Sequence, residues 1–304
     1  MTLRLAITGV DGFVGRHVAQ IAAERGHHVV GVTRSADATV AGVAELVEAD
    51  LTEQWPRTPP VDAIVHLAGL AAVGPSFDEP VRYIVENAAM TAHLCEALLR
   101  HDEPARVVAA STGAIYAPSD EPIDETATLA YASPYAVSKG TVEHLLSYYR
   151  GRGLDTVVAR PFNHIGAGQS PGFLVPDLLE HLDGLGDEEP LPAGNLDAER
   201  DYTDVRDVAT AYLLLAEAPV LAHDVYNVAS GRARSGHEVL AAICAALGRS
   251  VPELGTGELR PLDMPRVVGD ATRLRDELDW APAHDFADSI AAAVSAHAGV
   301  RPSA

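Results

Sequence analysis

Residues 3–15 of the chain read LRLAITGVDGFVG, an apolar run followed by regularly spaced glycines. The run at 3–10 has the length and composition of a buried strand, and the segment at 12–26, GFVGRHVAQIAAERG, carries apolar residues at helical spacing. The glycines of the turn stand at positions 9, 12 and 15. A strand, a glycine-rich turn and a helix in this order are typical of a dinucleotide-binding site.

Each glycine of this turn has its own physical role. Gly9 permits a tight turn, Gly12 lets the backbone approach a pyrophosphate, and Gly15 allows the helix to pack closely against the strand. The positive end of the helix dipole, where Phe13 and Val14 lie, attracts the phosphates. We therefore expect these five residues to contact a dinucleotide cofactor.

Outward from this turn, strand-like and helix-like segments alternate through the first half of the chain. Apolar residues recur at helical spacing within 80–100 and 134–150. Short runs rich in Val and Ala predict further strands at 27–34, 62–69, 106–112 and 155–162. Repeated strand–helix units imply a parallel sheet covered by helices on both faces, with right-handed crossovers. We expect residues 1–162 to form a Rossmann-type, doubly wound α/β domain that binds the dinucleotide.

The composition changes after about residue 163. Gly and Pro become frequent, as in NHIGAGQSPG and GLGDEEPLPAGN, and the alternation is less regular. We expect residues 163–304 to form a smaller C-terminal α/β lobe that binds the substrate at the carboxyl edge of the sheet. Part of 200–230 is expected to return to the Rossmann domain.

Length and charge bound the class of protein. The chain has 304 residues, enough for one large or two modest domains, and a formal net charge of −21. This negative charge argues against nucleic acid and anionic membranes as partners. No apolar run approaches the ~20 residues that span a bilayer. The N-terminus enters an apolar strand almost at once, so we expect a cytoplasmic protein.

Two cysteines, Cys95 and Cys244, lie within apolar helical patterns. Their positions form neither a metal-binding spacing nor a disulfide framework. We expect both to be buried core thiols, and we expect no metal site.

The tip of the second strand predicts which dinucleotide binds. An acidic residue there would hydrogen-bond the adenosine ribose and favour NAD. The strand ends instead in VTRS, where Arg34 is available for a 2′-phosphate, so NADP(H) is favoured over NAD(H). A solvated loop charge is the other interpretation of Arg34. Further cofactor contacts are expected after the third and fourth strands, from Asp50, Leu51, Leu67, Ala68 and Gly69.

A tyrosine and the single lysine of the chain stand four residues apart in SPYAVSKG, at 133–140. On a helix, Tyr135 and Lys139 share one face. A neighbouring ammonium favours the phenolate, so we expect Lys139 to lower the pKa of Tyr135 from its ordinary value of about 10. The strand end AASTGAIY, at 109–116, offers the hydroxyls of Ser111 and Thr112. One of them can bind the substrate oxygen that Tyr135 protonates.

The glycine turn, the motifs HLAG and ENAAMT, and Thr112, Tyr135 and Lys139 together resemble the extended short-chain dehydrogenase/reductase family over nearly the whole chain. The resemblance implies that Thr112 is the catalytic hydroxyl beside Tyr135 and Lys139. It also implies that Asn87 shapes the site. Asn87, Tyr135, Lys139 and Pro161 would then join the residues that contact the cofactor.

Motifs of the second half narrow the resemblance. The segments RPFNHIGAGQSPGF, GNLDAERDYTDVRDVATAYLLL, VYNVASG and LRPLDMPRVVGD look most like those of GDP-4-keto-6-deoxy-D-mannose reductases. This implies NADPH-dependent reduction of the C4 keto group of a nucleotide-linked 4-keto-6-deoxyhexose. Asn163, Arg200 and Arg260 would bind the nucleotide-diphosphate sugar, because arginine forks match phosphate oxygens. Surface ion pairs with Asp201 or Asp263 are the other interpretation of the two arginines.

The family pattern also implies an exclusion and an assembly. Sugar-nucleotide 4,6-dehydratases place an acidic residue two positions after the catalytic threonine, where this chain has Ala114, so a dehydratase is not expected. Ala117, after Tyr116, departs from the glycine that relatives usually carry there. In this family two helices pair across a two-fold axis, which implies a homodimer through 80–100 and 134–150.

Three other functions are compatible with these motifs. A dTDP-linked 4-ketohexose reductase would use the same residues, since the base follows from the resemblance alone. A nucleotide-sugar 4-epimerase would keep NAD tightly bound and return the hydride to its substrate. A non-catalytic dinucleotide-sensing protein would bind NADPH without turnover, but the complete set of Thr112, Tyr135 and Lys139 argues against it.

Overall fold

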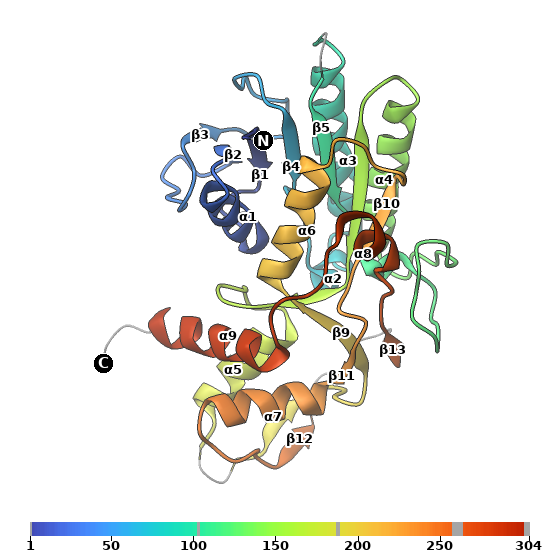
Figure 1. Cartoon of the computed structure of the whole chain (residues 1–304). Coiled ribbons are helices and arrows are strands. Elements are labelled where there is room, and N and C mark those ends of the chain that lie inside the picture. The colour runs from blue at the N-terminus through green and yellow to red at the C-terminus, as the bar shows by residue number, and fades with distance from the viewer. Residues whose placement is uncertain (1, 102–103, 187–188, 257–263, 301–304) are drawn as a thin grey trace.

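The structure is a computed structural model that describes residues 2–101, 104–186, 189–256 and 264–300. Its centre is a parallel seven-stranded sheet in the order β10-β6-β5-β4-β1-β2-β3 (Figure 1). The strands of this sheet are β1 (Arg4–Thr8), β2 (His28–Thr33), β3 (Glu45–Glu48), β4 (Ala63–His66), β5 (Arg106–Ala110), β6 (Thr156–Pro161) and β10 (Val225–Val228). The prediction of a Rossmann-type, doubly wound α/β fold is confirmed.

Helices cover both faces of this sheet (Figure 1). On one face α1 (Phe13–Glu24) packs against α6 (Val205–Glu217), and on the other α3 (Pro80–Leu98) packs against α4 (Pro134–Arg150). The short elements α2 (Val73–Ser76) and η1 (Gly113–Ile115) contact α4, and α8 (Thr272–Leu278) contacts β10. The layers are therefore helix, sheet and helix, as alternating strand–helix units require.

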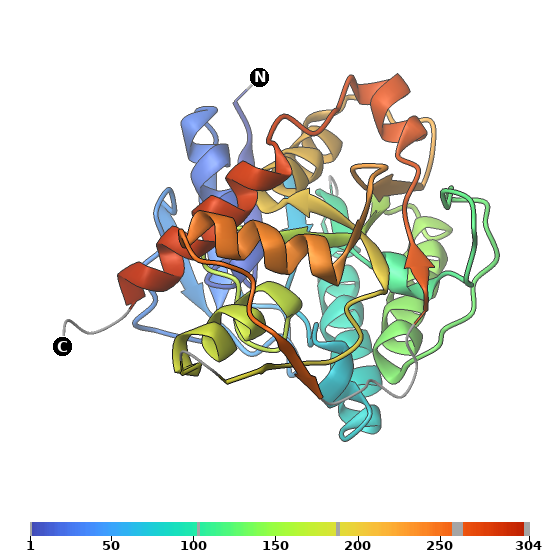
Figure 2. The same ribbon diagram turned by 90° about the horizontal axis from the view of Figure 1, so that it is seen from below.

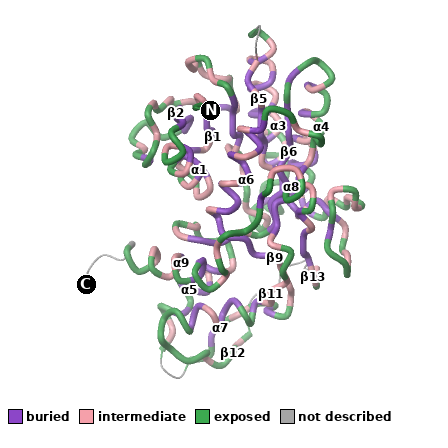
Figure 3. Tube along the Cα trace, viewed as in Figure 1, coloured by how far each residue is buried: buried purple, intermediate pink, exposed green. Residues whose placement is uncertain are grey.

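Buried residues lie along the central strands and on the helices that pack against them, as the purple segments of the tube in Figure 3 show. The central strands β1 and β4 are buried on both faces, which explains their continuous apolar sequences, whereas the edge strand β3 alternates. One core cluster joins the sheet to α1 and α6, through residues such as Val18, Ala22 and Val208. Another joins it to α3 and α4, through Leu94 and Leu146.

The second half of the chain builds a smaller lobe, which lies below the sheet in Figure 1 and is seen from beneath in Figure 2. Its strands form one four-stranded and one two-stranded sheet: β7 (Asn163–Ile165), β9 (Glu199–Asp204), β11 (Ala233–Ser235) and β13 (Arg266–Val267), then β8 (Leu191–Ala193) and β12 (Leu254–Thr256). A separate core lies among its helices, α5 (Leu174–Gly184), α7 (Gly236–Ala246) and α9 (Phe286–Val300). The chain then crosses back, because β9 runs into α6 and β10 pairs with β6.

The strand order reverses between β1 and β4, which pair although β2 and β3 intervene in the sequence. In open parallel sheets, ligands bind outside the carboxyl ends of the strands at such a reversal. The turn after β1 and the loop after β4 meet there, since a Cβ built on Gly9 would lie 3.1 Å from the Cα of Ala68. The fold therefore brings the predicted cofactor residues of both loops to one edge of the sheet.

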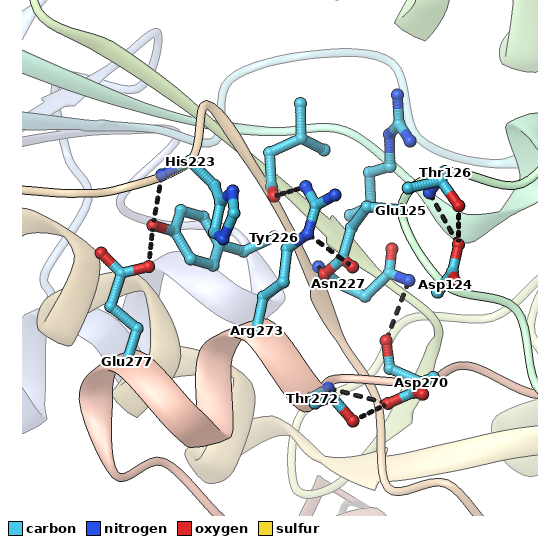
Figure 4. A network of polar contacts seen from close by, with 12 residues as sticks. Asp124, Glu125, Thr126, His223, Tyr226, Asn227, Asp270, Thr272, Arg273 and Glu277 are labelled. Carbon is cyan, nitrogen blue, oxygen red and sulfur yellow. Dashed lines mark hydrogen bonds and ion pairs between the residues drawn. The ribbon is translucent and has the colours of Figure 1, made fainter.

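Side chains close the outer edge of β10 (Figure 4). Glu125 accepts a hydrogen bond from the backbone N–H of Asn227 at 2.7 Å, and Arg273 donates to the Val225 carbonyl oxygen at 3.2 Å. Glu125 and Arg273 also form an ion pair at 3.3 Å. An unpaired strand edge can pair with a strand of another molecule. Glu125 and Arg273 occupy backbone groups of β10 that such a strand would bind, and their contacts anchor the loop that carries Glu125.

Replacing Gly15 with alanine tests how closely α1 must approach β1. A Cβ at this position would lie 2.2 Å from the Gly9 carbonyl oxygen and 2.8 Å from the Val10 Cα, both of them backbone atoms. We expect Gly15→Ala to lower the free energy of unfolding by about 1–3 kcal/mol in urea denaturation. Gly184→Ala is the control, because nothing lies within 4 Å of its Cβ. Equal stabilities of the two variants would contradict the close packing.

Candidate active site

The glycine turn fits a dinucleotide pyrophosphate. Gly9 has a φ of +64°, a left-handed conformation that favours glycine. Gly12 is the N-cap of α1 and has no side chain to cap the helix, so the first amide groups of α1 lack a side-chain acceptor. Such N–H groups at the start of a helix form an anion site. Phe13, Val14 and Gly15 follow as the first residues of α1, where they flank this site.

The tip of β2 carries no carboxylate. β2 ends at Thr33, and Arg34, which follows it, is exposed. Hydrogen bonds from Thr52, helped by the charge of Arg34, lower the pKa of Asp50. Arg34 therefore lies close enough to Asp50 to act on its charge, which brings two predicted cofactor residues together. Leu51, beside Asp50, is buried in the core.

Hydrogen bonds fix the loop that follows β4. The Thr8 hydroxyl oxygen accepts from the backbone N–H groups of Leu67 and Ala68, at 3.0 Å each. Its proton is therefore directed to Nδ1 of His66, 2.9 Å away. Burial lowers the pKa of His66 to about 3, so the imidazole is neutral and Nδ1 acts as the acceptor. Thr8 and His66 together hold the predicted cofactor loop against β1.

Asn87 joins this loop to α4. Its side-chain oxygen accepts from the Leu70 N–H at 2.8 Å, and its side-chain amide donates to the Leu70 carbonyl oxygen at 3.2 Å. The same amide donates to the Ser138 hydroxyl at 2.9 Å, and Ser138 donates to the Tyr135 carbonyl oxygen at 2.8 Å. The contacts of Asn87 are thus to the loop and the helix that would hold the cofactor.

Tyr135, Lys139 and Thr112 meet at the carboxyl edge of the sheet. Ser133 is the N-cap of α4, so Tyr135 and Lys139 lie in its first two turns. The Thr112 hydroxyl hydrogen-bonds the Tyr135 phenol. Lys139 Nζ donates to the Ala110 carbonyl oxygen at the end of β5, at 2.8 Å. All three side chains are buried, and the structure therefore brings together the residues that the sequence predicted to be catalytic.

Burial corrects one expectation about this cluster. It raises the pKa of Tyr135 to about 12, against a smaller opposing effect of the hydrogen bond with Thr112. Lys139 does not offset this effect, because its ammonium donates to Ala110 and burial lowers its own pKa to about 8. The prediction that Lys139 lowers the pKa of Tyr135 is therefore wrong for the protein without its ligands, in which the phenol holds its proton.

The structure distinguishes the two hydroxyls at the end of β5. Ser111 donates to the Glu143 carboxylate, so its proton is committed within the protein. Thr112 is the N-cap of η1, where its oxygen accepts from the Ala114 N–H at 3.1 Å. This leaves the Thr112 proton for another acceptor. Thr112 is therefore the hydroxyl of the pair that can donate to a substrate oxygen.

Two residues that sequence reasoning missed support this edge of the sheet. Arg160 of β6 donates two hydrogen bonds to the Glu143 carboxylate of α4, from Nε at 2.9 Å and from Nη2 at 2.6 Å. Arg160 also donates from Nη1 to the Tyr116 hydroxyl at 2.8 Å. Charge inside apolar patterns is the signal that could have found them. Arg160 interrupts a fully buried strand, and Glu143 lies one helical turn after Lys139.

The residues expected to bind the substrate lie on the lobe. They come later in the sequence than the catalytic cluster. Asn163 begins β7 and is exposed. It follows Pro161, at the end of β6, and Phe162, whose ring lies against Gly113 of η1. Arg200 lies half-buried on β9, next to β7 in the sheet. The expected contact from Arg260 falls outside the described residues.

Some features of the described residues limit the chemistry. Ala114 on η1 places a methyl group, not a carboxylate, two positions after Thr112. Ala117 donates its N–H to the Thr128 carbonyl oxygen at 2.8 Å and does not adopt the left-handed backbone that would favour glycine.

Among the described residues, no group of three or more His, Cys, Asp or Glu side chains could hold a metal ion. Within the same ranges, no helix combines the length and apolarity needed to traverse a bilayer.

Comparisons with known proteins agree with this geometry. The model of the NAD dependent epimerase/dehydratase family matches residues 5–229. The chain is 34% identical to a GDP-6-deoxy-D-mannose reductase from Pseudomonas aeruginosa, over 97% of each protein. It is 31% identical to a UDP-glucose 4-epimerase from Azospirillum brasilense, over 94% of this chain and 89% of that protein.

A solved structure shows the same relationship. The UDP-glucose 4-epimerase of Thermus thermophilus, in complex with NAD, matches with a TM-score of 0.85 at 29% identity, over 98% of this chain and 100% of that one. The resemblance to extended short-chain dehydrogenases/reductases and the prediction of an enzyme are thereby confirmed. From the glycine turn, the Tyr135–Lys139 pair and these matches together, the chain belongs to the NAD-dependent epimerase/dehydratase family.

Proposed function

We propose that the protein uses NADPH to reduce the C4 keto group of a nucleotide-linked 4-keto-6-deoxyhexose, as a GDP-4-keto-6-deoxy-D-mannose reductase does. The observation that carries this proposal is the tip of β2, where Arg34 stands and no carboxylate does. An arginine there suits the 2′-phosphate of NADP(H). The similarity to a GDP-6-deoxy-D-mannose reductase over 97% of the chain supports the substrate class.

Each residue of the cluster has a separate role in this reduction. When bound, the cofactor supplies the hydride for the sugar C4 carbon. Tyr135 donates its phenol proton to the developing alkoxide, and a phenol with a raised pKa is the correct form for that step. Thr112 donates a hydrogen bond to the same oxygen, and Lys139 holds the nicotinamide ribose. Carbon gains a hydride and oxygen gains a proton, so the ketone becomes a secondary alcohol.

The nucleotide diphosphate of the substrate is assigned to the lobe. Asn163 and Arg200 lie on the paired strands β7 and β9, and Arg260 completes the set in this proposal. Arginine side chains are suited to phosphate oxygens, since two parallel N–H groups match them. The reductase relative supports GDP as the nucleotide, and a dTDP-linked sugar is the alternative.

The state of the cysteines fits a cytoplasmic location. Cys95 and Cys244 are free, buried thiols. Burial raises the pKa of Cys95 to about 12, so its thiol is unreactive. Free thiols are usual where the surroundings are reducing, and we place the enzyme in the cytoplasm on that basis.

A nucleotide-sugar 4-epimerase is the second candidate. The similarity to UDP-glucose 4-epimerases favours it, at 31% identity in sequence and a TM-score of 0.85 in structure. An epimerase would keep NAD bound and would use Thr112, Tyr135 and Lys139 first to oxidise C4 and then to reduce it again. Net oxidation of NADPH separates the two functions.

The test supplies NADPH with GDP- or dTDP-linked 4-keto-6-deoxyhexoses and follows the absorbance of NADPH. We expect stoichiometric oxidation of NADPH with the GDP-linked sugar, and NMR of the product to show a secondary alcohol at C4. UDP-glucose with NAD is the comparison. If the enzyme interconverts UDP-glucose and its C4 epimer and consumes no NADPH with either keto sugar, the protein is an epimerase.

The same assay measures the part played by Tyr135. Tyr135→Phe removes the proton donor and keeps the ring, so we expect NADPH binding to persist and kcat to fall by about 10²–10⁴-fold. Tyr149→Phe is the matched control, because Tyr149 is buried on the same helix and its hydroxyl donates to Glu96. Near-normal turnover in Tyr135→Phe would exclude this tyrosine as the acid.

Arg34→Ala tests the choice of cofactor. Loss of a charged hydrogen bond to the 2′-phosphate should raise KM for NADPH by about 10–100-fold and leave KM for NADH unchanged. Arg152→Ala is the control, because Arg152 pairs with Glu96 beyond the far end of α4. An equal effect of Arg34→Ala on both cofactors would show that Arg34 does not read the 2′-phosphate.

We also propose a homodimer through α3 and α4, which pack side by side. On α3, Val81 is 72% exposed and Val85 is 57% exposed; on α4, Val137 is 39% exposed and Tyr148 is 59% exposed. Exposed apolar side chains on two neighbouring helices are typical of an interface. A second copy of the same face, related by a two-fold axis, would cover them.

Charge on this face tests the dimer. Val81→Glu with Val85→Glu should convert a dimer into a monomer in sedimentation velocity, because each copy would bring two carboxylates into an apolar contact. Val220→Glu is the control, since Val220 is 77% exposed and lies outside α3 and α4. A dimer that survives both glutamates would place the interface elsewhere.

A further inference from the structure

Glu143 of α4 is a buried carboxylate that the roles assigned above leave unexplained. Its side chain is 10% exposed, and that of its partner Arg160 is 6% exposed. It accepts hydrogen bonds from Nε and Nη2 of Arg160, at 2.9 and 2.6 Å, and from the hydroxyl of Ser111. Burial of a charge carries a desolvation cost that a surface carboxylate does not have. Its place beside the catalytic cluster therefore calls for a function.

Glu143 and Lys139 contact two consecutive residues at the end of β5, the last residue of the strand and the one that follows it. They stand four residues apart, on one face of α4. Lys139 Nζ donates to the Ala110 carbonyl oxygen at 2.8 Å, and Glu143 accepts from the hydroxyl of the next residue, Ser111. Two side chains one helical turn apart thus fasten the end of β5 to the catalytic helix.

We propose that Glu143 is a positioning residue for the catalytic cluster. It holds the end of β5 so that the Thr112 hydroxyl meets the Tyr135 phenol, and its negative charge lies one helical turn along α4 from the buried Lys139. Thr112 directly follows Ser111, so a shift of the strand end along α4 would separate the hydroxyl from the phenol. Only the catalytic consequence of this alignment rests on the proposed function.

The groups around Lys139 show why the charge of Glu143 matters. Burial lowers the pKa of Lys139 to about 8, and the negative charge of Glu143 opposes that shift. His66 of β4, whose pKa the charge of Lys139 helps to lower, is neutral, and Tyr135 on the same helix as Lys139 is protonated. Arg160 from β6 is paired with Glu143. Removal of the Glu143 carboxylate should therefore favour the neutral amine.

A purely structural role is the competing explanation. The ion pair could serve only to tie α4 to β6. In that case its removal would change the stability of the protein but not the titration of Lys139. The two explanations thus differ in a quantity that can be measured without cofactor or substrate.

The single lysine makes this measurement direct. Protein grown with 13C-labelled lysine gives one set of lysine side-chain signals, and their pH dependence reports the protonation of Lys139. In the cofactor-free wild type we expect a midpoint of about 8. Glu143→Gln should lower this midpoint, whereas Glu143→Asp, which keeps the charge, should stay close to wild type. An unchanged midpoint in Glu143→Gln would overturn the electrostatic role.

A matched control and a second variant protect this test. Glu96→Gln removes the same charge from another ion pair, with Arg152, and should leave the midpoint unchanged. Glu143→Gln strands Arg160 without a counter-charge and can fail to fold. Glu143→Leu with Arg160→Met removes both charges and keeps apolar bulk, an exchange that buried ion pairs often tolerate. This double variant should also lower the midpoint, and a wild-type titration in it would equally refute the electrostatic role.

Ser111→Ala tests the positioning role. It removes the hydroxyl that joins β5 to Glu143 and leaves the ion pair in place. Because a misplacement of about 1 Å can cost about 100-fold in rate, we expect kcat to fall by about 10-fold or more with little change in KM for NADPH. Full turnover in this variant would overturn the positioning role. If wild type itself turned over no keto sugar, the proposed reduction would fall, and the lysine titration would still decide the role of Glu143.

Discussion

The buried ammonium of Lys139 is the constraint that the surrounding structure has to satisfy. The residue is 7% exposed at the edge of the central sheet, where an unpaired charge would cost several kcal/mol. The Ala110 carbonyl oxygen and the charge of Glu143 compensate it. Glu143 in turn requires Arg160, and Arg160 donates to Tyr116. The burial of one charge at the reactive centre thus requires that several further polar groups be buried with it.

This series of hydrogen bonds continues to the outer edge of the sheet, where it joins the network of Figure 4. The Tyr116 hydroxyl donates to the side-chain oxygen of Asn227 at 2.7 Å. The side-chain amide of Asn227 donates to the carbonyl oxygens of Ile123 and Asp270, at 2.9 and 3.1 Å. Ile123 belongs to the loop that follows η1, and Asp270 follows β13 of the lobe. A polar network in a low-dielectric interior is favourable only when its members are satisfied. The catalytic helix and the lobe are therefore held by one connected set of hydrogen bonds.

The sequence predicted the parts of the site whose geometry is local. The glycine turn acts within a few residues, and Tyr135 and Lys139 act within one helical turn, so spacing alone places them. Ser111 and Glu143 are 32 residues apart, and Glu143 and Arg160 are 17 apart. Their contacts depend on which strand lies beside α4, which spacing does not reveal. The sequence did not predict the raised pKa of Tyr135 for a similar reason. Burial has the largest effect on this pKa, and burial is a property of the whole fold.

The raised pKa of Tyr135 bears on the proposed direction of hydride transfer. At neutral pH, a phenol with a pKa of about 12 holds its proton, and this is the form that reduction of a ketone consumes. Oxidation of a sugar alcohol requires the phenolate instead. An oxidised nicotinamide ring carries a positive charge that favours the phenolate, whereas the reduced ring does not. The buried, protonated form of Tyr135 therefore supports the reduction proposed above. An epimerase, which begins with oxidation, would depend on its bound NAD to reverse the effect of burial.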